Sequence, residues 1–203
     1  VIAQGAFECH ANEYNKEPNA FPFLLSLVFR FTGVNEAWAH VLNRMLFSLG
    51  VVFAFWIGVL LFNNYWMAAG AGLLYMLTPE NLLWGATVAV EPGTAAFIGL
   101  AVGAWILFLK DTNWPTTVFA AGAVAFASQW RPESVLLIPL VVAATLFLAP
   151  RQLKKRHVYS VGLIVLVLLI PHLGHLWAVR GEGWGSSSEA GKFAASYVPG
   201  NLK

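Results

Sequence analysis

The sequence predicts an all-α fold, a polytopic transmembrane helical bundle. Of the 203 residues, 58% are hydrophobic and only 11% are charged, whereas roughly 25% of the residues in an average soluble domain are charged. Several apolar runs approach the roughly 20 residues that a transmembrane helix needs; the clearest are residues 41–62, 93–109 and 158–179. These runs are too many and too long for a soluble core, so we expect about six membrane helices.

One basic stretch, Arg151 to His157, sets the expected orientation. It holds four Lys or Arg residues between two apolar segments, and the positive-inside rule places such a stretch in the cytoplasm. From there the chain is expected to cross outward at residues 158–179. Backward from the stretch, the expected membrane helices are residues 134–149, 115–129, 93–109, 65–78 and 41–61.

This topology divides the chain into three parts. Residues 1–40 form an external loop, residues 41–180 the transmembrane helical domain, and residues 181–203 an external Gly- and Ser-rich segment. Within the first part, residues 21–31 are too short to span a membrane and include Arg30, so we expect a helix lying at the membrane interface. Of ten carboxylates only Asp111 falls in the cytoplasm, which leaves the acidic residues of this integral membrane protein on its periplasmic, extracellular or lumenal side.

The hairpin of residues 115–129 and 134–149 is too short for a bilayer. Each arm measures about 23 Å at roughly 1.5 Å per residue, against a hydrocarbon core of roughly 30 Å. Arg131 and Glu133 would then lie below the outer hydrocarbon surface, where an unpaired charge costs roughly 2 to 3.5 kcal/mol or more. The helix at residues 65–78 is similarly short, and non-helical backbone is expected to sink after it, in residues 79–92. We therefore expect an external-facing polar pocket.

Two residue groups could place chemistry in this pocket, and each has a plainer interpretation. Glu91, before Pro92, could be an N-cap that complements the helix dipole, or a pocket carboxylate acting as base, substrate ligand or metal ligand. The segment Trp130 to Glu133 could be an ordinary turn with paired charges. It could instead present the Arg131 guanidinium to a phosphate, with Glu133 beside it.

Other candidates give weaker signals. Glu8, His10 and Glu13 lie within six residues, which could bind a divalent metal or simply form a solvated loop. His172 and His175 share a helix face, where they could line the pocket or hydrogen-bond at the helix end. Gly99, Gly103 and the small residues 120–123 indicate helix packing. A net charge of +2 makes nucleic acid an improbable partner, and the single cysteine, Cys9, excludes an internal disulfide.

Three stretches resemble the GT-C membrane glycosyltransferases related to protein O-mannosyltransferases and aminoarabinose lipid A transferases. The first runs from Tyr14-Asn15-Lys16-Glu17-Pro18 through Phe29-Arg30-Phe31-Thr32-Gly33 to Asn43-Arg44. The second is Ala89-Val90-Glu91-Pro92, and the third is Gln129-Trp130-Arg131-Pro132-Glu133. The resemblance rests on the order and spacing of these stretches together, and it covers roughly residues 8 to 150.

The resemblance implies transfer of a sugar from a polyprenyl-phosphate donor to a protein or glycolipid acceptor on the non-cytoplasmic face, with inversion at the anomeric carbon. It implies Glu13 or Glu8 as the base and Glu91 as a pocket carboxylate. Arg131, Lys16 and Arg44 become phosphate-binding candidates, because cations stabilise a leaving phosphate. Membrane lipids are further expected partners.

In such relatives an acidic residue usually follows a first membrane helix, and this sequence shows neither. We therefore expect the chain to be a piece of a longer protein, with a base that could lie before Val1. The alternative is a non-catalytic membrane subunit or scaffold of a larger complex, with partner subunits. A transporter is a third possibility, but matching halves with broken helices are not seen.

Overall fold

The computed structural model describes residues 20–180, and the side chains of residues 20–174. In this part of the chain all regular secondary structure is helical, so the predicted all-α class is confirmed. The elements are α2 (Ala20–Thr32), α3 (Glu36–Phe62), α4 (Tyr65–Leu77), α5 (Pro79–Ala86), α6 (Glu91–Lys110), α7 (Trp114–Ala127), η2 (Pro132–Leu136), α8 (Leu137–Leu148), η3 (Pro150–Lys154) and α9 (Arg156–Arg180).

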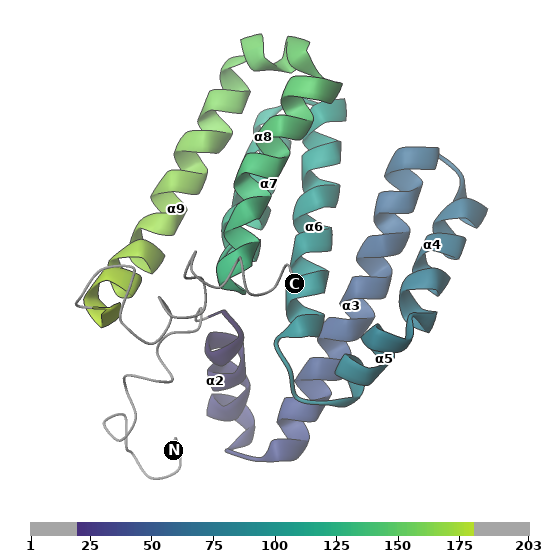
Figure 1. Cartoon of the computed structure of the whole chain (residues 1–203), viewed down its shortest axis with the longest axis vertical. Helices are drawn as coiled ribbons and strands as arrows, with labels where there is room; N and C mark the ends of the chain where they lie inside the picture. Colours follow the sequence, from purple (N-terminus) through teal and green to yellow (C-terminus); the bar gives the residue numbers. More distant parts are fainter. Residues whose placement is uncertain (1–19, 181–203) are drawn as a thin grey trace, which may run out of the picture.

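Helix α6 lies at the centre of the bundle. It packs against α3 on one side and α7 on the other, while α4 packs on the outside of α3 and α9 on the outside of α7 (Figure 1). The turn between α3 and α4 and the basic stretch Arg151 to His157 lie at one end of the bundle. Helices α2 and α5 lie toward the opposite end, which also holds the start of α6.

Asparagine side chains start several of these helices. Asn35 accepts a hydrogen bond from the backbone of Ala37 at the start of α3, and Asn64 does the same for Trp66 at the start of α4. Asn113 and Thr116 form a reciprocal capping box at the start of α7. Such caps satisfy backbone N–H groups that have no partner within the helix. They explain why the predicted helix boundaries before α4 and α7 fall within a few residues of the observed ones.

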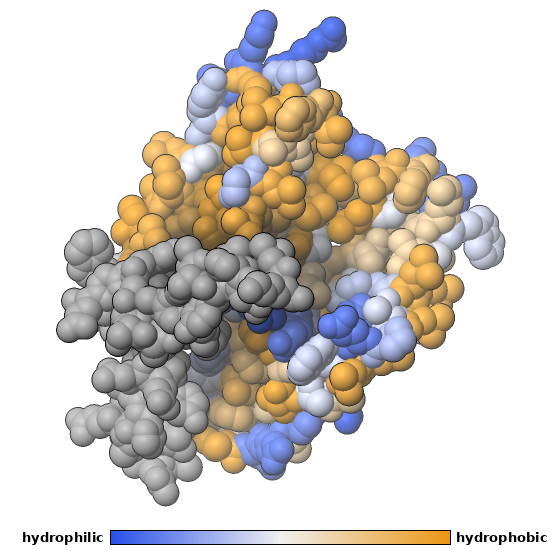
Figure 2. Space-filling view, in the orientation of Figure 1, coloured by the Kyte–Doolittle hydropathy of each residue, from blue (hydrophilic) through white to orange (hydrophobic). Residues whose placement is uncertain are grey.

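Three helices are long and apolar enough to cross a membrane, judged by length and composition: Glu36–Phe62, Glu91–Lys110 and Arg156–Gly174. The arms of the predicted short hairpin are indeed short, because α7 has 14 residues and α8 has 12. At roughly 1.5 Å per residue, α7 is about 21 Å long. Hydrophobic residues cover most of the visible surface of the helices, as expected for an integral membrane bundle (Figure 2).

The segment after α4 differs from the prediction. We expected non-helical backbone through residues 79–92, but residues 79–86 form the two-turn helix α5. Pro79 occupies the first turn, where a missing N–H costs nothing, and Glu80 lies in the same turn, where its charge complements the helix dipole. The side-chain amide of Asn81 also donates a 3.0 Å hydrogen bond to the backbone oxygen of Tyr75. Only residues 87–90 remain non-helical.

Glycine permits the close approach of α6 to α3. A Cβ atom on Gly103 would lie 2.4 Å from the ring of Trp56, and one on Gly99 would touch Phe53 at 3.4 Å. The buried alanines of the 120–123 run join the main apolar core. The predicted role of these small residues in helix packing is therefore confirmed.

Candidate active site

The candidate site lies where the start of α6 meets the hairpin between α7 and η2. Glu91 is the first residue of α6, and the N-cap position belongs to Val90, which makes no side-chain cap bond. The interpretation of Glu91 as an N-cap is therefore wrong by one position. Its carboxylate, in the first turn, still interacts favourably with the helix dipole, and its side chain remains available for other contacts.

Arg131 joins two carboxylates from different elements. Its Nε atom lies 2.7 Å from Oε1 of Glu133, and its Nη1 atom lies 3.5 Å from Oε1 of Glu91. The first contact is a close ion pair, and the second is a hydrogen bond from Nη1 at the outer limit of distance. The arginine side chain is 36% exposed and that of Glu91 is 31% exposed. The guanidinium is thus fixed on one side and accessible on another.

Trp130 positions this arginine. Its side chain is fully buried, and its ring stacks on Phe97 with centroids 4.9 Å apart. Phe126 meets the same indole edge-on at 6.1 Å, and Phe21 of α2 lies 6.2 Å away. Gly93 faces the ring, since a Cβ atom there would lie 1.9 Å from it. We call Trp130 with Phe21, Phe97 and Phe126 the aromatic cluster, and it fixes the backbone on which Arg131 is carried.

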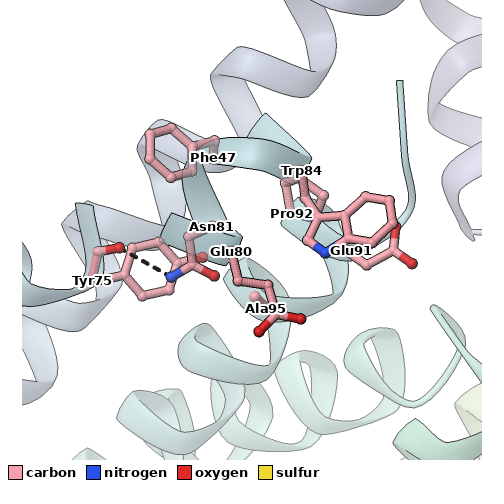
Figure 3. A pocket seen from close by; sticks show the side chains of 8 residues that line it. All are labelled: Phe47, Tyr75, Glu80, Asn81, Trp84, Glu91, Pro92 and Ala95. Carbon is pink, nitrogen blue, oxygen red and sulfur yellow. Dashed lines mark hydrogen bonds between the residues drawn. The ribbon is translucent and has the colours of Figure 1, made fainter. Parts of the chain in front are cut away.

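A small pocket of about 130 Å³ opens beside Glu91. Figure 3 shows Phe47 and Tyr75 toward one end of it and Trp84 and Glu91 toward the other. Its full lining combines two carboxylates with aromatic rings and an amide: Phe47, Tyr75, Glu80, Asn81, Trp84, Glu91, Pro92 and Ala95. At least half of these residues carry polar groups, so the pocket offers several hydrogen-bonding partners beside its apolar walls.

Asn43 ties the wall of this pocket to α3. The residue is completely buried, and its side-chain amide donates to the backbone oxygens of Trp84, at 2.9 Å, and of Thr87. These carbonyls lie at the end of α5, and the Trp84 oxygen also accepts a 3.3 Å hydrogen bond from the backbone N–H of Thr87. Asn43 therefore determines where α5, and with it Trp84, sits above α6.

The pocket side of the site is negative. Glu80 and Glu91 line the pocket, and two carboxylates, Glu91 and Glu133, pair with the Arg131 guanidinium. A carboxylate accepts hydrogen bonds from hydroxyl groups but repels a phosphate. The arrangement therefore separates a hydroxyl-accepting pocket from a single cationic position beside it.

The structure brings together only some of the predicted site residues. Arg44 is exposed on α3, and within the described residues it forms no ion pair. His172 is buried on α9 and does not line the pocket. Glu8, Glu13 and Lys16 lie outside the described residues, as does the side chain of His175.

The predicted metal ligands Glu8, His10 and Glu13 also lie outside the described part of the chain. Among residues 20–174, no group of three or more His, Cys, Asp or Glu side chains could hold a metal ion.

Several residues of the site escaped sequence reasoning. No role was predicted for Trp130, which the structure shows to be fully buried next to Arg131. No role was predicted for Asn43, although its neighbour Arg44 was a candidate for binding phosphate. A lone amide in an apolar helix is expected to hydrogen-bond to a neighbouring segment. Tyr75 and Trp84 carried no signal distinguishing them from other membrane aromatics.

The family described as dolichyl-phosphate-mannose-protein mannosyltransferase matches the chain over residues 16–175. The chain belongs to this family. The match spans the candidate site from α2 to α9, confirms the GT-C resemblance, and identifies a membrane glycosyltransferase of the mannosyltransferase type. No curated protein and no solved structure matches the chain.

Proposed function

We propose that this mannosyltransferase-family chain transfers a sugar from a polyprenyl-phosphate donor to an acceptor on the non-cytoplasmic face of the membrane. The observation that carries the proposal is the position of Arg131, held between Glu91 and Glu133 beside a pocket lined by further polar groups. Charged side chains within a membrane domain are costly and usually functional. Here three of them meet: Glu91 from the start of α6, and Arg131 and Glu133 from the turn after α7 and the start of η2.

The reaction has simple requirements. A carboxylate removes the proton of the acceptor hydroxyl, whose oxygen then forms a bond to the anomeric carbon from the side opposite the phosphate. The bond between that carbon and the phosphate oxygen breaks, and its electron pair stays on the phosphate. Because attack and departure are on opposite faces, the configuration inverts. The protein must therefore supply a base and a cation that stabilises the departing phosphate.

The charges suggest how the donor would lie. Its phosphate fits beside Arg131, because the side chain remains 36% exposed although Nε and Nη1 are engaged by carboxylates. Its sugar hydroxyls fit the negative pocket, where Glu80 and Glu91 can accept hydrogen bonds and Trp84 offers an apolar ring face. The polyprenyl chain would then run along the outer, lipid-facing surface.

The remaining predicted residues keep their proposed roles. Glu13 or Glu8 is the candidate base, and Lys16 and Arg44 are further candidates for binding the phosphate. His172 and His175 are retained as substrate-side candidates, although His172 lies on α9, which packs against α7, and does not line the pocket. A divalent metal bound by the N-terminal residues also stays a proposal.

Glu91→Gln tests the proposal directly. Gln keeps the size and one acceptor oxygen but removes the charge, so folding should be preserved while transfer from a polyprenyl-phosphate sugar falls by on the order of a hundredfold. The assay is sugar transfer by the purified protein across a panel of such donors, with thermal unfolding measured in parallel. Wild-type turnover by Glu91→Gln would remove Glu91 from the site.

Glu36→Gln is the matched control. Glu36 also lies in the first turn of a long helix, but its side chain is 86% exposed, and among the described residues it pairs with His40 alone, at 3.6 Å. This variant should keep full activity. If the unmutated protein shows no turnover with any donor, the non-catalytic subunit becomes the better interpretation.

A further inference from the structure

An apolar slot lies between α8 and α9, at the end of the bundle that carries the basic stretch. Its volume is about 290 Å³, which exceeds the roughly 150 Å³ of an apolar cavity able to bind benzene. The slot exists because α9 packs against α7 and η3 rather than along α8. Trp105 of α6 and Val124 of α7 form its floor.

The slot is elongated along the helix axes. Its walls run from Ile138 to Thr145 on α8 and from Val158 to Leu166 on α9, so each wall is roughly 10 to 12 Å long at 1.5 Å per residue. Val142 and Leu166, at 48% and 62% exposure, lie at its outer edge. A groove of this shape faces the lipid and follows the direction in which acyl chains run in a bilayer.

One end of the slot is closed by the basic stretch. Leu153 of η3 lines the slot, and its neighbours Arg151, Lys154, Lys155 and Arg156 are all exposed. Within the described residues, none of these four cations lies within ion-pair distance of a carboxylate. They therefore form an uncompensated positive rim.

Gln152 holds this rim in place. Its side-chain amide donates a 2.9 Å hydrogen bond to the backbone oxygen of Leu109, and its carbonyl oxygen accepts one of 3.1 Å from Thr112. Both partners belong to the end of α6 and the turn that follows it. The turn that bears the four cations is thus attached to the central helix.

We propose that this slot binds one acyl chain of an anionic phospholipid, whose phosphate contacts the basic stretch. An acyl chain in the slot would make van der Waals contacts with its apolar walls. The positive rim would favour negatively charged headgroups, with each nearby Lys or Arg contributing about fivefold in affinity. The site is distinct from the proposed donor site, because the 14 residues of α7 separate the two ends. It does not depend on the proposed transferase function.

Trp105 provides the reporter, because bromine on an acyl chain quenches a tryptophan that it touches. The purified full chain is placed in two series of nanodiscs. One series contains increasing proportions of phosphatidylglycerol with brominated acyl chains, and the other contains increasing proportions of phosphatidylcholine with brominated acyl chains. We expect more quenching at low proportions of brominated phosphatidylglycerol than of brominated phosphatidylcholine. This excess should disappear in Trp105→Phe, which identifies the slot as its source.

Two kinds of variant test the two halves of the site. The triple variant Lys154→Gln, Lys155→Gln, Arg156→Gln should lose about fivefold of the phosphatidylglycerol preference for each charge removed. Gly162→Leu should fill the slot and abolish the Trp105 excess. Gly70→Leu on α4 is its control, since an added Cβ meets nothing within 4 Å at either glycine.

Native mass spectrometry gives a second measurement that does not depend on tryptophan. The unmutated protein should retain phosphatidylglycerol through detergent purification, and the triple variant should not. Equal quenching by the two lipids, or an excess that survives the triple variant or Gly162→Leu, would overturn the proposal. So would a slot occupied by another protein segment, which would leave Trp105 unquenched by either lipid.

Discussion

Gly93 of α6 and Trp130, in the turn between α7 and η2, lie in direct contact, so that a methyl group on Gly93 would sit 1.9 Å from the indole ring. The ring cannot retreat easily, because it is fully buried and stacked on Phe97. Gly93 therefore sets the position of Trp130, and through the chain the position of Arg131. A glycine without chemistry of its own thus controls the geometry of the charged groups.

Gly93→Ala should be destabilising and should also lower transfer. Overpacking of this kind typically costs about 1 to 3 kcal/mol, and the displaced Trp130 would move Arg131 away from Glu91. Thermal unfolding and sugar transfer are the measurements. Gly122→Ala on α7 is the control, because its added Cβ meets nothing within 4 Å. Equal stability and activity for both variants would show that the contact is not tight.

Arg131→Ala and Arg131→Lys should differ in their binding of polyprenyl phosphate. Lysine keeps the charge but lacks the planar guanidinium that can contact two carboxylates at once. The lysine variant should therefore position the phosphate of the lipid less well. Loss of a hydrogen bond to a charged group costs about 1.5 to 3 kcal/mol, and we expect about a 10- to 100-fold weaker affinity for alanine and a smaller loss for lysine. Titration with the unglycosylated lipid phosphate measures both. Unchanged affinity in the alanine variant would remove Arg131 from the phosphate site.

Asn43→Ala should loosen α5. The substitution removes the Asn43 donor from the backbone oxygens of Trp84 and Thr87. The Trp84 oxygen keeps its hydrogen bonds from Thr87, so we expect a cost of about 0.5 to 1.5 kcal/mol for each hydrogen bond lost. We expect lower thermal stability together with weaker donor binding, since Trp84 lines the pocket. Ser48→Ala in the same helix should change little, because its hydroxyl is exposed and bonds only to Arg44 of its own helix. A loss of similar size in both variants would argue against a specific role for Asn43.

The orientation can be tested by cysteine labelling in a Cys9→Ser background. Lys155→Cys lies in the basic stretch, and Val34→Cys lies in the turn between α2 and α3, where the side chain is 59% exposed. A membrane-impermeant maleimide applied to intact cells should label the second variant and reach the first only after permeabilisation. The reverse pattern would invert the topology and place the candidate site in the cytoplasm.

The fold could be predicted from the sequence to a large extent, because its signals are local. Apolar runs indicated the membrane helices, and the Asn63-Asn64 pair indicated the turn before α4, where Asn63 adopts the left-handed conformation with φ of 49°. Helix α5 was missed, since Pro79 and Gly85 resemble loop residues. What makes it helical is partly remote, as Asn43 satisfies the carbonyls at its end.

The site was less predictable, because it depends on packing. The sequence indicated Glu91 and Arg131 separately, but their contact joins residues 40 positions apart. Bringing them together requires Gly93 of α6 to meet Trp130 in the turn after α7. The pocket likewise needs α5 in place above α6, and no pattern of spacing in the sequence reports that arrangement.

The aromatic cluster also bears on how this region can change in evolution. One indole is shared by rings from α2, α6 and α7, so a change in the size of any ring alters the space available to the others. Substitutions at Phe21, Phe97 and Phe126 are therefore expected to be strongly epistatic, with combined effects that differ from the sum of the single ones. Relatives that lack Trp130 should differ at Gly93 as well, and this covariation would link the start of α6 to the charged turn after α7.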